Sequence, residues 1–220
     1  MGKEIDLLAS LPKTKRNIEK RAEAKDDALV AISRKYGQEY WDGDRKYGYG
    51  GYRYDGRWRS VARDMIAHFG LKPGMRVLDV GCGKGFLVKD LILECPGLEA
   101  FGLDISHYSL MHCEKEVIGR LHLGTAESLP FPDGSFDCVV SLNTIHNFTR
   151  DGAIVAMREI QRQSGGRAFV QVDSYRTPEE KEIAESWIIT ARFHDYPDGW
   201  LKVYAEAGYT GDYYWTIINR

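Results

Sequence analysis

Residues 75–88 read M-R-V-L-D-V-G-C-G-K-G-F-L-V, and this stretch decides the fold. A short apolar run that contains Asp79 ends in three glycines at alternate positions, Gly81, Gly83 and Gly85, and an apolar helical pattern begins directly after them. This order predicts a strand, a tight turn and the first turn of a helix. Glycines suit the turn because a Cβ atom would obstruct both its backbone angles and the close approach of a ligand. The stretch therefore predicts a ligand-binding turn.

The second apolar run ends in an acidic residue at the distance expected for a nucleoside site. Asp104 follows the apolar residues 100–103 and lies about 20 residues after Gly85, which is the spacing of a carboxylate that binds ribose hydroxyls. The dinucleotide fingerprint G-x-G-x-x-G would place a small residue at position 86, where this chain has Phe86. Because the observed spacing is G-x-G-x-G, we expect an adenosine-type ligand and no binding of NAD or NADP.

Three motifs in the right order resemble one enzyme family. They are V-L-D-V-G-C-G-K-G at residues 77–85, G-L-D-I-S at residues 102–106 and A-E-S-L-P-F-P-D-G-S-F-D at residues 126–137. Over about residues 70–166 the chain resembles the class I S-adenosylmethionine (SAM) dependent methyltransferases, and most of all the ubiquinone and menaquinone methyltransferase-like subgroup. The resemblance implies an enzyme with a Rossmann-like α/β fold, a doubly wound and mostly parallel sheet, and SAM as its cofactor.

The resemblance also implies which residues hold the cofactor. Asp104 is expected to accept hydrogen bonds from both ribose hydroxyls, and Ile105 is expected to lie against the adenine ring. Thr125 stands where family members commonly carry an aspartate, and it is a weaker acceptor for the adenine amino group. The full expected set is Asp79, Gly81, Cys82, Gly83, Gly85, Asp104, Ile105, Thr125, Ala126, Glu127 and Asn143.

Catalytic candidates follow the expected fourth and fifth strands, because an open α/β sheet binds ligands at the carboxyl ends of its strands. Residues 136–142 deliver Asn143 and His146, and residues 168–172 deliver Asp173. His146 is either a general base that takes a proton from the acceptor or a structural histidine at a helix start. Catechol-type members hold magnesium with acids after both strands. Here the fourth strand ends in Asn143, so no metal is expected.

The segment before the matched region is unusually rich in rings and glycines. Residues 36–58 hold eight of the 26 aromatic residues and six of the 23 glycines. Loops of this length are uncommon without a role, so we expect either a lid that excludes water from the cofactor or a self-packed surface loop. As a lid, residues 47–58 would become ordered over the cofactor, with Tyr49 and Tyr52 as catalytic candidates in the wall of the methyl-transfer site.

Periodicity predicts the remaining elements. Residues 15–36 have the pattern of one amphipathic helix, which either packs on the domain or contributes to the lid. Residues 209–220 fit either a tight hairpin or a single strand. The other expected elements are helices at 59–69, 86–94, 107–117, 153–162, about 178–187 and 201–207, and strands at about 76–80, 100–103, 121–123, 136–142 and 168–172.

Length and composition limit the function. A chain of 220 residues with 43% hydrophobic content predicts one methyltransferase domain, residues 59–220, with an N-terminal extension, residues 1–58. A formal net charge of −2 without a long basic run gives no electrostatic attraction to nucleic acid or to an anionic membrane. Four cysteines without metal-ligand spacing and no apolar signal segment predict a cytoplasmic protein; a homodimer is left open.

These observations support two classes of function. The first is an enzyme that moves the methyl group of SAM to an oxygen, in preference to a nitrogen, of a small polar acceptor. Arg45, Arg53 and Arg57 among the aromatic residues suit a sugar or a sugar nucleotide, since rings stack on sugar faces and guanidinium groups pair with phosphate. A peptide or protein acceptor stays open. The second class is a SAM-binding protein that transfers no methyl group, for example a regulatory subunit.

Overall fold

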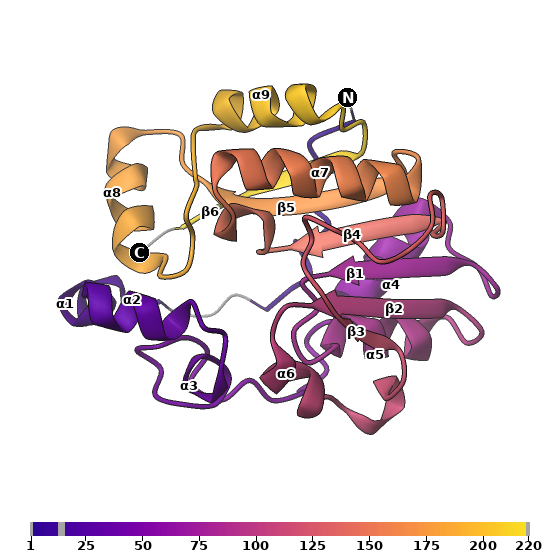
Figure 1. Cartoon of the computed structure of the whole chain (residues 1–220), viewed down its shortest axis with the longest axis horizontal. Helices are drawn as coiled ribbons and strands as arrows, with labels where there is room; N and C mark the ends of the chain where they lie inside the picture. The colour runs from indigo at the N-terminus through magenta and orange to yellow at the C-terminus, as the bar shows by residue number, and fades with distance from the viewer. Residues whose placement is uncertain (1, 13–15, 219–220) are drawn as a thin grey trace.

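The computed structural model describes residues 2–12 and 16–218, and its centre is a sheet of six strands (Figure 1). The strands follow the order β3-β2-β1-β4-β5-β6, and every neighbouring pair is parallel. Their bounds are β1 (Arg76–Val80), β2 (Glu99–Asp104), β3 (Leu121–Leu123), β4 (Cys138–Leu142), β5 (Ala168–Ser174) and β6 (Asp212–Ile217). The predicted doubly wound α/β fold is confirmed. The strand order reverses between β1 and β4, which leaves a crevice at their carboxyl ends.

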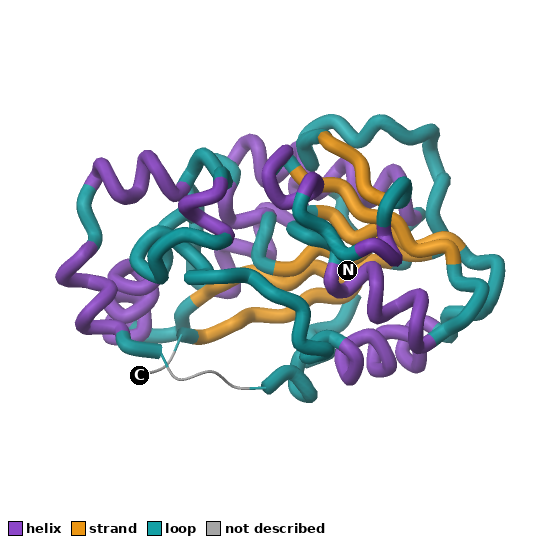
Figure 2. The backbone as a smooth tube through the Cα atoms, turned by 90° about the horizontal axis from the view of Figure 1, so that it is seen from below, coloured by secondary structure: helices purple, strands orange, loops and turns teal. Residues whose placement is uncertain are grey.

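Helices cover both faces of the sheet (Figure 2). One face carries α4 (Arg59–Phe69) and α5 (Phe86–Glu94), and the other carries α7 (Arg150–Ser164) and α9 (Pro197–Ala207). The other helical segments are α1 (Ile18–Ala24), α2 (Asp27–Ser33), α3 (Gln38–Trp41), α6 (His107–Met111) and α8 (Pro178–Trp187), with 3₁₀ turns η1 (Lys115–Val117) and η2 (Ile145–Asn147). Among the described residues, no helix is both long and apolar enough to cross a membrane.

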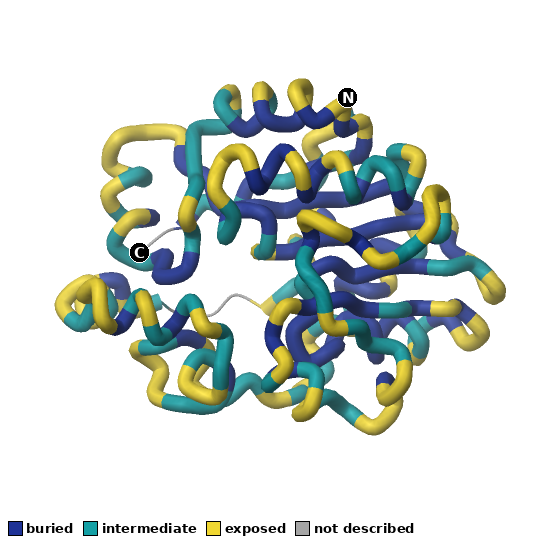
Figure 3. The backbone as a smooth tube through the Cα atoms, viewed as in Figure 1, coloured by how far each residue is buried: buried dark blue, intermediate teal, exposed yellow. Residues whose placement is uncertain are grey.

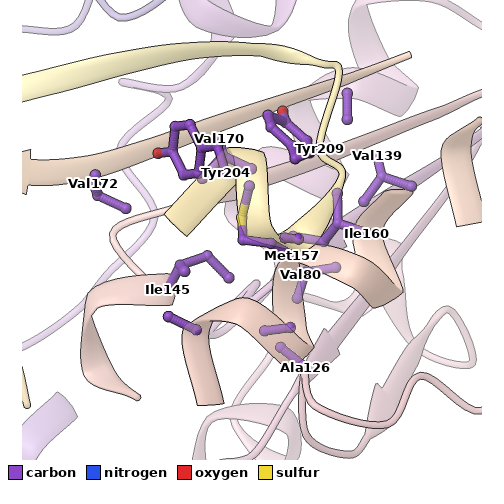
Figure 4. Close-up of a cluster of buried hydrophobic side chains, with 14 of the residues drawn as sticks. Val80, Ala126, Val139, Ile145, Met157, Ile160, Val170, Val172, Tyr204 and Tyr209 are labelled. Carbon is purple, nitrogen blue, oxygen red and sulfur yellow. The ribbon is translucent and has the colours of Figure 1, made fainter. Parts of the chain in front are cut away.

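The core has two halves because successive strand residues point to opposite faces of the sheet. On the α7 and α9 side, Val170 and Val172 of β5 pack with Met157 (Figure 4). On the α4 and α5 side, Phe169 is fully buried with Val77. All seven residues of β5 are buried. Figure 3 shows the same division, with buried strands inside and exposed outer helix turns.

The end of the described chain is a single strand, which is one of the two arrangements that the sequence left open. β6 runs parallel to β5, with Phe169 opposite Asp212 and Ser174 opposite Ile217. Glu4 forms a parallel bridge with Tyr213 on the outer side of β6. The backbone of residues 3–5 therefore satisfies part of the free edge of the sheet. The predicted segment extends to residues 219–220, which lie outside the described residues.

Two predicted helices are shorter than expected. The helix expected over residues 15–36, whose first residue lies outside the described ones, is divided into α1 and α2. The division has a local cause, because Asp26 caps the second helix by accepting a hydrogen bond from the backbone N–H of Leu29 at 2.7 Å. Lys25 is extended there, and its Nζ donates to the carbonyls of Glu185 and Ile188. Likewise, the helix expected over residues 107–117 ends at Met111 and resumes as η1.

Capping determines several other boundaries. A capping box starts α8: Thr177 Oγ1 accepts the backbone N–H of Glu180 at 3.2 Å, and Glu180 Oε2 accepts that of Arg176 at 2.6 Å. α9 begins at Pro197, four residues before the predicted start, with proline at its first position. α7 starts at Arg150 because Thr149 caps it. A short helix, α3, lies inside the loop expected over residues 36–58.

The N-terminal segment packs on the core. Leu7 is buried with residues of α4 and α5, and Trp41 is buried at 5% exposure. In Figure 1, α1, α2, α3 and α8 lie beyond the arrowheads of the strands. The boundary at residue 58 between extension and domain stays a prediction.

We predict that Phe169→Ala destabilises the protein by about 3–5 kcal/mol, because it removes a fully buried ring and leaves a cavity between β5 and the α4–α5 layer. The matched control is Leu93→Ala, since Leu93 in α5 is 44% exposed; a change within about 0.5 kcal/mol is expected there. Urea unfolding measures both. Equal losses for the two variants would contradict the assignment of Phe169 to the core.

Candidate functional site

A cavity of about 350 Å³ lies at the carboxyl ends of β1, β2 and β4. Its floor comes from the loops that follow these strands, and its roof comes from residues 34–49. Eight of the predicted site residues line it, namely Gly81, Asp104, Ile105, Thr125, Ala126, Glu127, Asn143 and Tyr49. Seven predicted site residues do not line it in the described structure. One of them, Tyr52, contacts Trp41 and Tyr49 of the roof. The other six are Asp79, Cys82, Gly83, Gly85, His146 and Asp173. The structure therefore brings together the predicted nucleoside end of the site more completely than the predicted catalytic end.

Asp104 is held in the cavity by hydrogen bonds to both of its carboxylate oxygens. Its side chain is buried, and its two carboxylate oxygens accept separate backbone hydrogen bonds, from Gly83 N–H and from Ser106 N–H, both at 2.7 Å. Burial raises the pKa of Asp104, while these backbone donors oppose the rise. Each carboxylate oxygen has two lone pairs, so each can accept one more hydrogen bond from a ligand in the cavity. This geometry fits a pair of ribose hydroxyls.

The glycines of the turn are required by protein neighbours as well as by backbone angles. Gly81 has a φ of +86°, and a Cβ atom there would lie 1.9 Å from Thr144 Oγ1. Gly83 has a φ of +56°, and a Cβ atom there would lie 2.8 Å from the ring of Trp41. The space beside Gly83, expected from the sequence to admit a ligand, is thus taken by the roof. Gly81 is the glycine of the turn that lines the cavity.

An exposed apolar side chain marks the next part of the cavity. Ile105 is 58% exposed although its neighbour Asp104 is buried, and it lines the cavity. A flat apolar ligand ring would cover it, which fits the predicted adenine contact. Thr125 also lines this part, and its Oγ1 accepts the backbone N–H of Glu127 at 3.3 Å. The hydroxyl thus orders its own loop in addition to facing the cavity.

Asn143 supplies the polar corner after β4. It is one of two non-glycine residues with a positive φ among the described residues, at +54°, a conformation that asparagine adopts more readily than most residues. Gln171 of β5 holds it there: Asn143 N–H donates to Gln171 Oε1 at 3.0 Å, and Asn143 Oδ1 accepts from Gln171 Nε2 at 3.1 Å. The Nδ2 amide of Asn143 stays available as a donor at the cavity.

The roof is attached to the loop after β2. The indole N–H of Trp41 donates to Ser106 Oγ at 2.9 Å and to the carbonyl of Tyr36 at 3.0 Å. Ser106 Oγ also donates to the carbonyl of Tyr36 at 2.6 Å. Since Ser106 N–H binds Asp104, the roof and the acidic residue are linked through one serine. None of these roof contacts was expected from the sequence.

An ion pair and a stack of rings hold the roof on the glycine turn. Lys84, which lies within the turn and is 6% exposed, binds both carboxylate oxygens of Asp42, at 2.7 and 2.8 Å, and the carbonyl of Tyr52 at 2.8 Å. Tyr49 stacks on Trp41 at 5.2 Å, and Tyr52 stacks on Phe86 of α5 at 4.6 Å. Residues 36–58 are therefore packed over the turn. Their ordering on cofactor binding stays a prediction.

His146 lies behind the cavity wall. It is 3% exposed, and its Nδ1 accepts the backbone N–H of Asp173 at 3.1 Å. Burial lowers the pKa of His146, against the opposing effect of Asp173, so the ring is neutral at neutral pH. With Nδ1 acting as an acceptor, the proton of the neutral ring is on Nε2, and no free lone pair is left for a substrate proton. This placement favours the structural interpretation of His146, and the base role is left to experiment.

Fourteen of the 22 residues that line the cavity were not predicted as site residues from the sequence, among them three cations and one tryptophan. Arg34 and Lys35 follow α2, and Arg192 follows the segment after α8, so all three bring positive charge to the rim. Trp41 belongs to the aromatic segment that the sequence analysis considered as a whole. In the sequence, the only sign of this part of the site was the high aromatic and glycine content of residues 36–58. The position of each residue depends on tertiary contacts, such as Arg34 Nη2 donating to the carbonyl of Ala191 at 2.7 Å.

Asp79 is a buried carboxyl beneath the turn. Burial and the neighbouring charge of Asp104 raise its pKa to about 7. In the unfolded chain the group ionises near pH 3.9. Because the folded state retains the proton over this window, the contribution of Asp79 to stability is lost as the pH rises from about 4 to about 7.

We therefore predict that the stability of Asp79→Asn relative to the parent protein increases between about pH 4 and pH 8, by at most roughly 4 kcal/mol. Urea unfolding at both pH values measures the difference, with Asp198→Asn in the exposed first turn of α9 as the control. A difference between Asp79→Asn and the parent that does not change with pH would contradict the raised pKa.

Comparisons with known proteins agree with this fold. Residues 78–170 match a family described as a methyltransferase domain. The chain is 34% identical over 122 residues to the ubiquinone/menaquinone biosynthesis C-methyltransferase UbiE of Burkholderia orbicola, which covers 52% of this chain and 50% of the relative. It is also 34% identical over 118 residues to the sterol 24-C-methyltransferase ERG6B of Gibberella zeae, which covers 49% and 31%. The chain thus spans at most half the length of these curated relatives.

Solved structures show the same fold. A Haloferax volcanii chain from the complex with the Trm112 methyltransferase activator has a TM-score of 0.54 at 22% identity, covering 69% of this chain and 67% of that chain. A Bacillus halodurans structure has a TM-score of 0.52 at 22% identity, covering 67% and 68%. At this identity the likeness concerns the fold. Residues 78–170 therefore resemble a methyltransferase domain of the class I type, a family that uses S-adenosylmethionine, and the predicted likeness to the ubiquinone and menaquinone methyltransferases is confirmed.

Proposed function

We propose that this protein is an enzyme that transfers the methyl group of SAM to an oxygen, in preference to a nitrogen, of a small polar acceptor. The observation that carries the proposal is the buried Asp104 carboxylate, which keeps acceptor capacity on both oxygens beside the exposed Ile105 at one cavity. A ribose and a base attached to it need this combination of a polar acceptor and an apolar surface. The other predicted cofactor-binding residues that line the cavity are Gly81, Thr125, Ala126, Glu127 and Asn143.

The bound cofactor supplies an electrophilic methyl group on a positively charged sulfur. The chain's own residues hold and enclose the reactants. Asp104 and Ile105 would hold the nucleoside, and Gly81 and Asn143 would face the amino acid portion. The rings of Trp41 and Tyr49 close the cavity from above and keep out water. Desolvation and the charge of Asp104 raise the pKa of Tyr49, so its hydroxyl stays protonated and acts as a hydrogen-bond donor at neutral pH.

The cavity favours a small polar acceptor. Its volume of about 350 Å³ is at the lower end of the range for small-molecule sites, so the cofactor alone would fill much of it. The rim carries the cations Arg34, Lys35 and Arg192, together with the amides of Asn143 and Asn147. A sterol or quinone ring would bury these polar groups without giving them partners, which is unfavourable. A polar acceptor that carries oxygens can satisfy them.

The alternative, a protein that binds SAM without transferring its methyl group, shares the same cavity. Incubation with SAM and a pool of small metabolites separates the two functions, because methyl transfer releases S-adenosylhomocysteine. Calorimetric titration of SAM and of NAD tests the cofactor itself. Binding of NAD without binding of SAM would contradict both functions.

We predict that Asp104→Ala weakens SAM binding by about 1.5–3 kcal/mol, because two ribose hydroxyls lose a charged acceptor. Asp198→Ala, which removes an exposed carboxylate that does not line the cavity, should bind SAM as the parent does. Calorimetry measures both affinities, and Asp104→Asn separates the loss of charge from the loss of volume. Unchanged SAM affinity in Asp104→Ala would show that β2 does not contribute the ribose contact.

For His146 we predict that His146→Gln lowers turnover per folded molecule by less than about threefold, because the neutral ring has no free lone pair toward the cavity. The variant should lose about 1–3 kcal/mol of stability if the buried N–H of Asp173 is left without a good partner. Turnover and urea unfolding are measured together once an acceptor is known. A loss of 10²–10⁴-fold in turnover with unchanged SAM affinity would instead establish His146 as the base.

A further inference from the structure

Three arginines surround one tryptophan where the N-terminal segment meets α8. The guanidinium carbons of Arg21, Arg45 and Arg16 lie 4.3, 5.5 and 5.8 Å from the ring centre of Trp187. Arg21 belongs to α1, Arg45 to the loop after α3, and Trp187 is the last residue of α8. Figure 1 shows α1 directly beneath α8. We call Arg16, Arg21, Arg45 and Trp187 the arginine cluster.

The arginine cluster forms no ion pair with an acid among the described residues, although Arg16 acts to lower the pKa of the buried Asp173 carboxyl. None of the ion pairs in that part of the chain includes Arg16, Arg21 or Arg45. Burial and the charge of Arg45 lower the pKa of Arg21 to about 10, and burial also lowers that of Arg45. Glu185 of α8 pairs with Lys181. Partly buried positive charges without compensation destabilise the protein, and a bound anion would remove that penalty.

Much of the hydrogen-bonding capacity of the arginine cluster is free. Arg21 Nη2 donates to the carbonyls of Arg45, at 2.9 Å, and Gly48, at 3.2 Å, and Arg45 Nη1 also donates to Gly48. Arg16 makes no side-chain hydrogen bond to the described residues. Because a guanidinium carries five N–H donors, most donors of the three side chains can still bind a ligand.

The arginine cluster lies next to the cofactor cavity. The carbonyl of Gly48, which two of its arginines bind, directly precedes Tyr49 in the cavity wall. Tyr40 and Tyr49 both influence the pKa of Arg45, and both line the cavity. Arg16 lines a second cavity of about 300 Å³, together with Asn17, Ile18 and Glu19. The segment that carries Arg45, Gly48 and Tyr49 is therefore shared by the arginine cluster and the cavity wall.

We propose that the arginine cluster is an anion site that holds a phosphate group of the methyl acceptor, with Trp187 as its floor. The proposal rests on the proposed methyl transfer and names the acceptor as a phosphorylated compound. A phosphate ester carries a charge of about −1.5 to −2 and three acceptor oxygens, which suits several guanidinium forks. A single carboxylate would leave most of the positive charge uncompensated.

This site differs from the one expected from the sequence. Of the three arginines considered for an anionic acceptor, Arg45 belongs to the arginine cluster. Arg57 instead binds Asp55 through a two-pronged ion pair, with contacts between 2.6 and 2.9 Å. Among the described residues, Arg53 does not lie over the ring of Trp187. Two further members, Arg16 and Arg21, precede the aromatic segment in the sequence and reach it through the fold.

The test is calorimetric titration of the whole chain with inorganic pyrophosphate at constant ionic strength, with acetate and SAM titrated separately. The parent should bind pyrophosphate saturably and more tightly than acetate. Arg16→Gln and Arg45→Gln should each weaken pyrophosphate binding about tenfold or more, since each removes charged hydrogen bonds. SAM affinity should stay within about twofold of the parent in both variants.

Arg120→Gln is the matched control, because Arg120 also lies over an aromatic ring, Phe101 at 5.9 Å, at the opposite end of the strands. Arg16→Gln is the cleanest variant, since Arg21 ties α1 to the loop at Gly48 and Arg45 also donates to the Gly48 carbonyl. Thermal unfolding of every variant verifies folding, and Arg16→Gln removes no hydrogen bond of the described residues.

Three results would overturn the proposal while leaving the proposed function intact, provided that SAM binds. They are no saturable binding of pyrophosphate, equal losses in Arg120→Gln and the cluster variants, and acetate binding as tight as pyrophosphate binding. If SAM does not bind at all, the proposed function fails and this proposal fails with it.

Discussion

The site depends on a buried carboxylate, Asp104, that is held by two backbone N–H groups. A buried charge is tolerated only when hydrogen bonds replace its water, and here Gly83 and Ser106 each provide one. These donors belong to different loops, the turn after β1 and the loop after β2. The carboxylate therefore joins the two loops and keeps its remaining lone pairs at the cavity. Loss of the turn after β1 or of the loop after β2 would each remove one of these two donors.

The roof is held by the same network. Ser106, whose N–H binds Asp104, also binds Trp41 and the carbonyl of Tyr36 through its hydroxyl. The partly buried ion pair between Lys84 and Asp42 holds the other side of the roof on the glycine turn. Breaking a buried ion pair by moving one partner is costly, because the charge left behind is uncompensated. Opening of the roof therefore requires that the ion pair between Asp42 and Lys84 breaks and that water solvates both charges.

Charge is distributed unequally around the cavity. Asp104 lies at the floor of the cavity and Asp79 lies buried beneath the turn, and burial raises the pKa of both. Arg34, Arg192 and the arginine cluster lie at the roof and rim. A cofactor with a positively charged sulfur and amino group is favoured near the acids, and an anionic acceptor is favoured near the arginines. Such a division would orient the two reactants before any contact between them is made.

The sequence by itself determined the order of strands and helices, the glycine turn and the acid after β2, because these depend on local periodicity, backbone angles and fixed spacing. Cys82, Gly83 and Gly85 were correctly placed at the turn, yet Trp41 occupies the space beside Gly83 that a ligand was expected to use. Tertiary structure alone decided that β6 is one parallel strand and that His146 turns its Nδ1 to the backbone of Asp173. It also brought Arg16, Arg21 and Arg45 to Trp187, residues far apart in the chain. Contacts between distant residues leave no periodic pattern in a single sequence, since they arise from the packing of whole elements against one another.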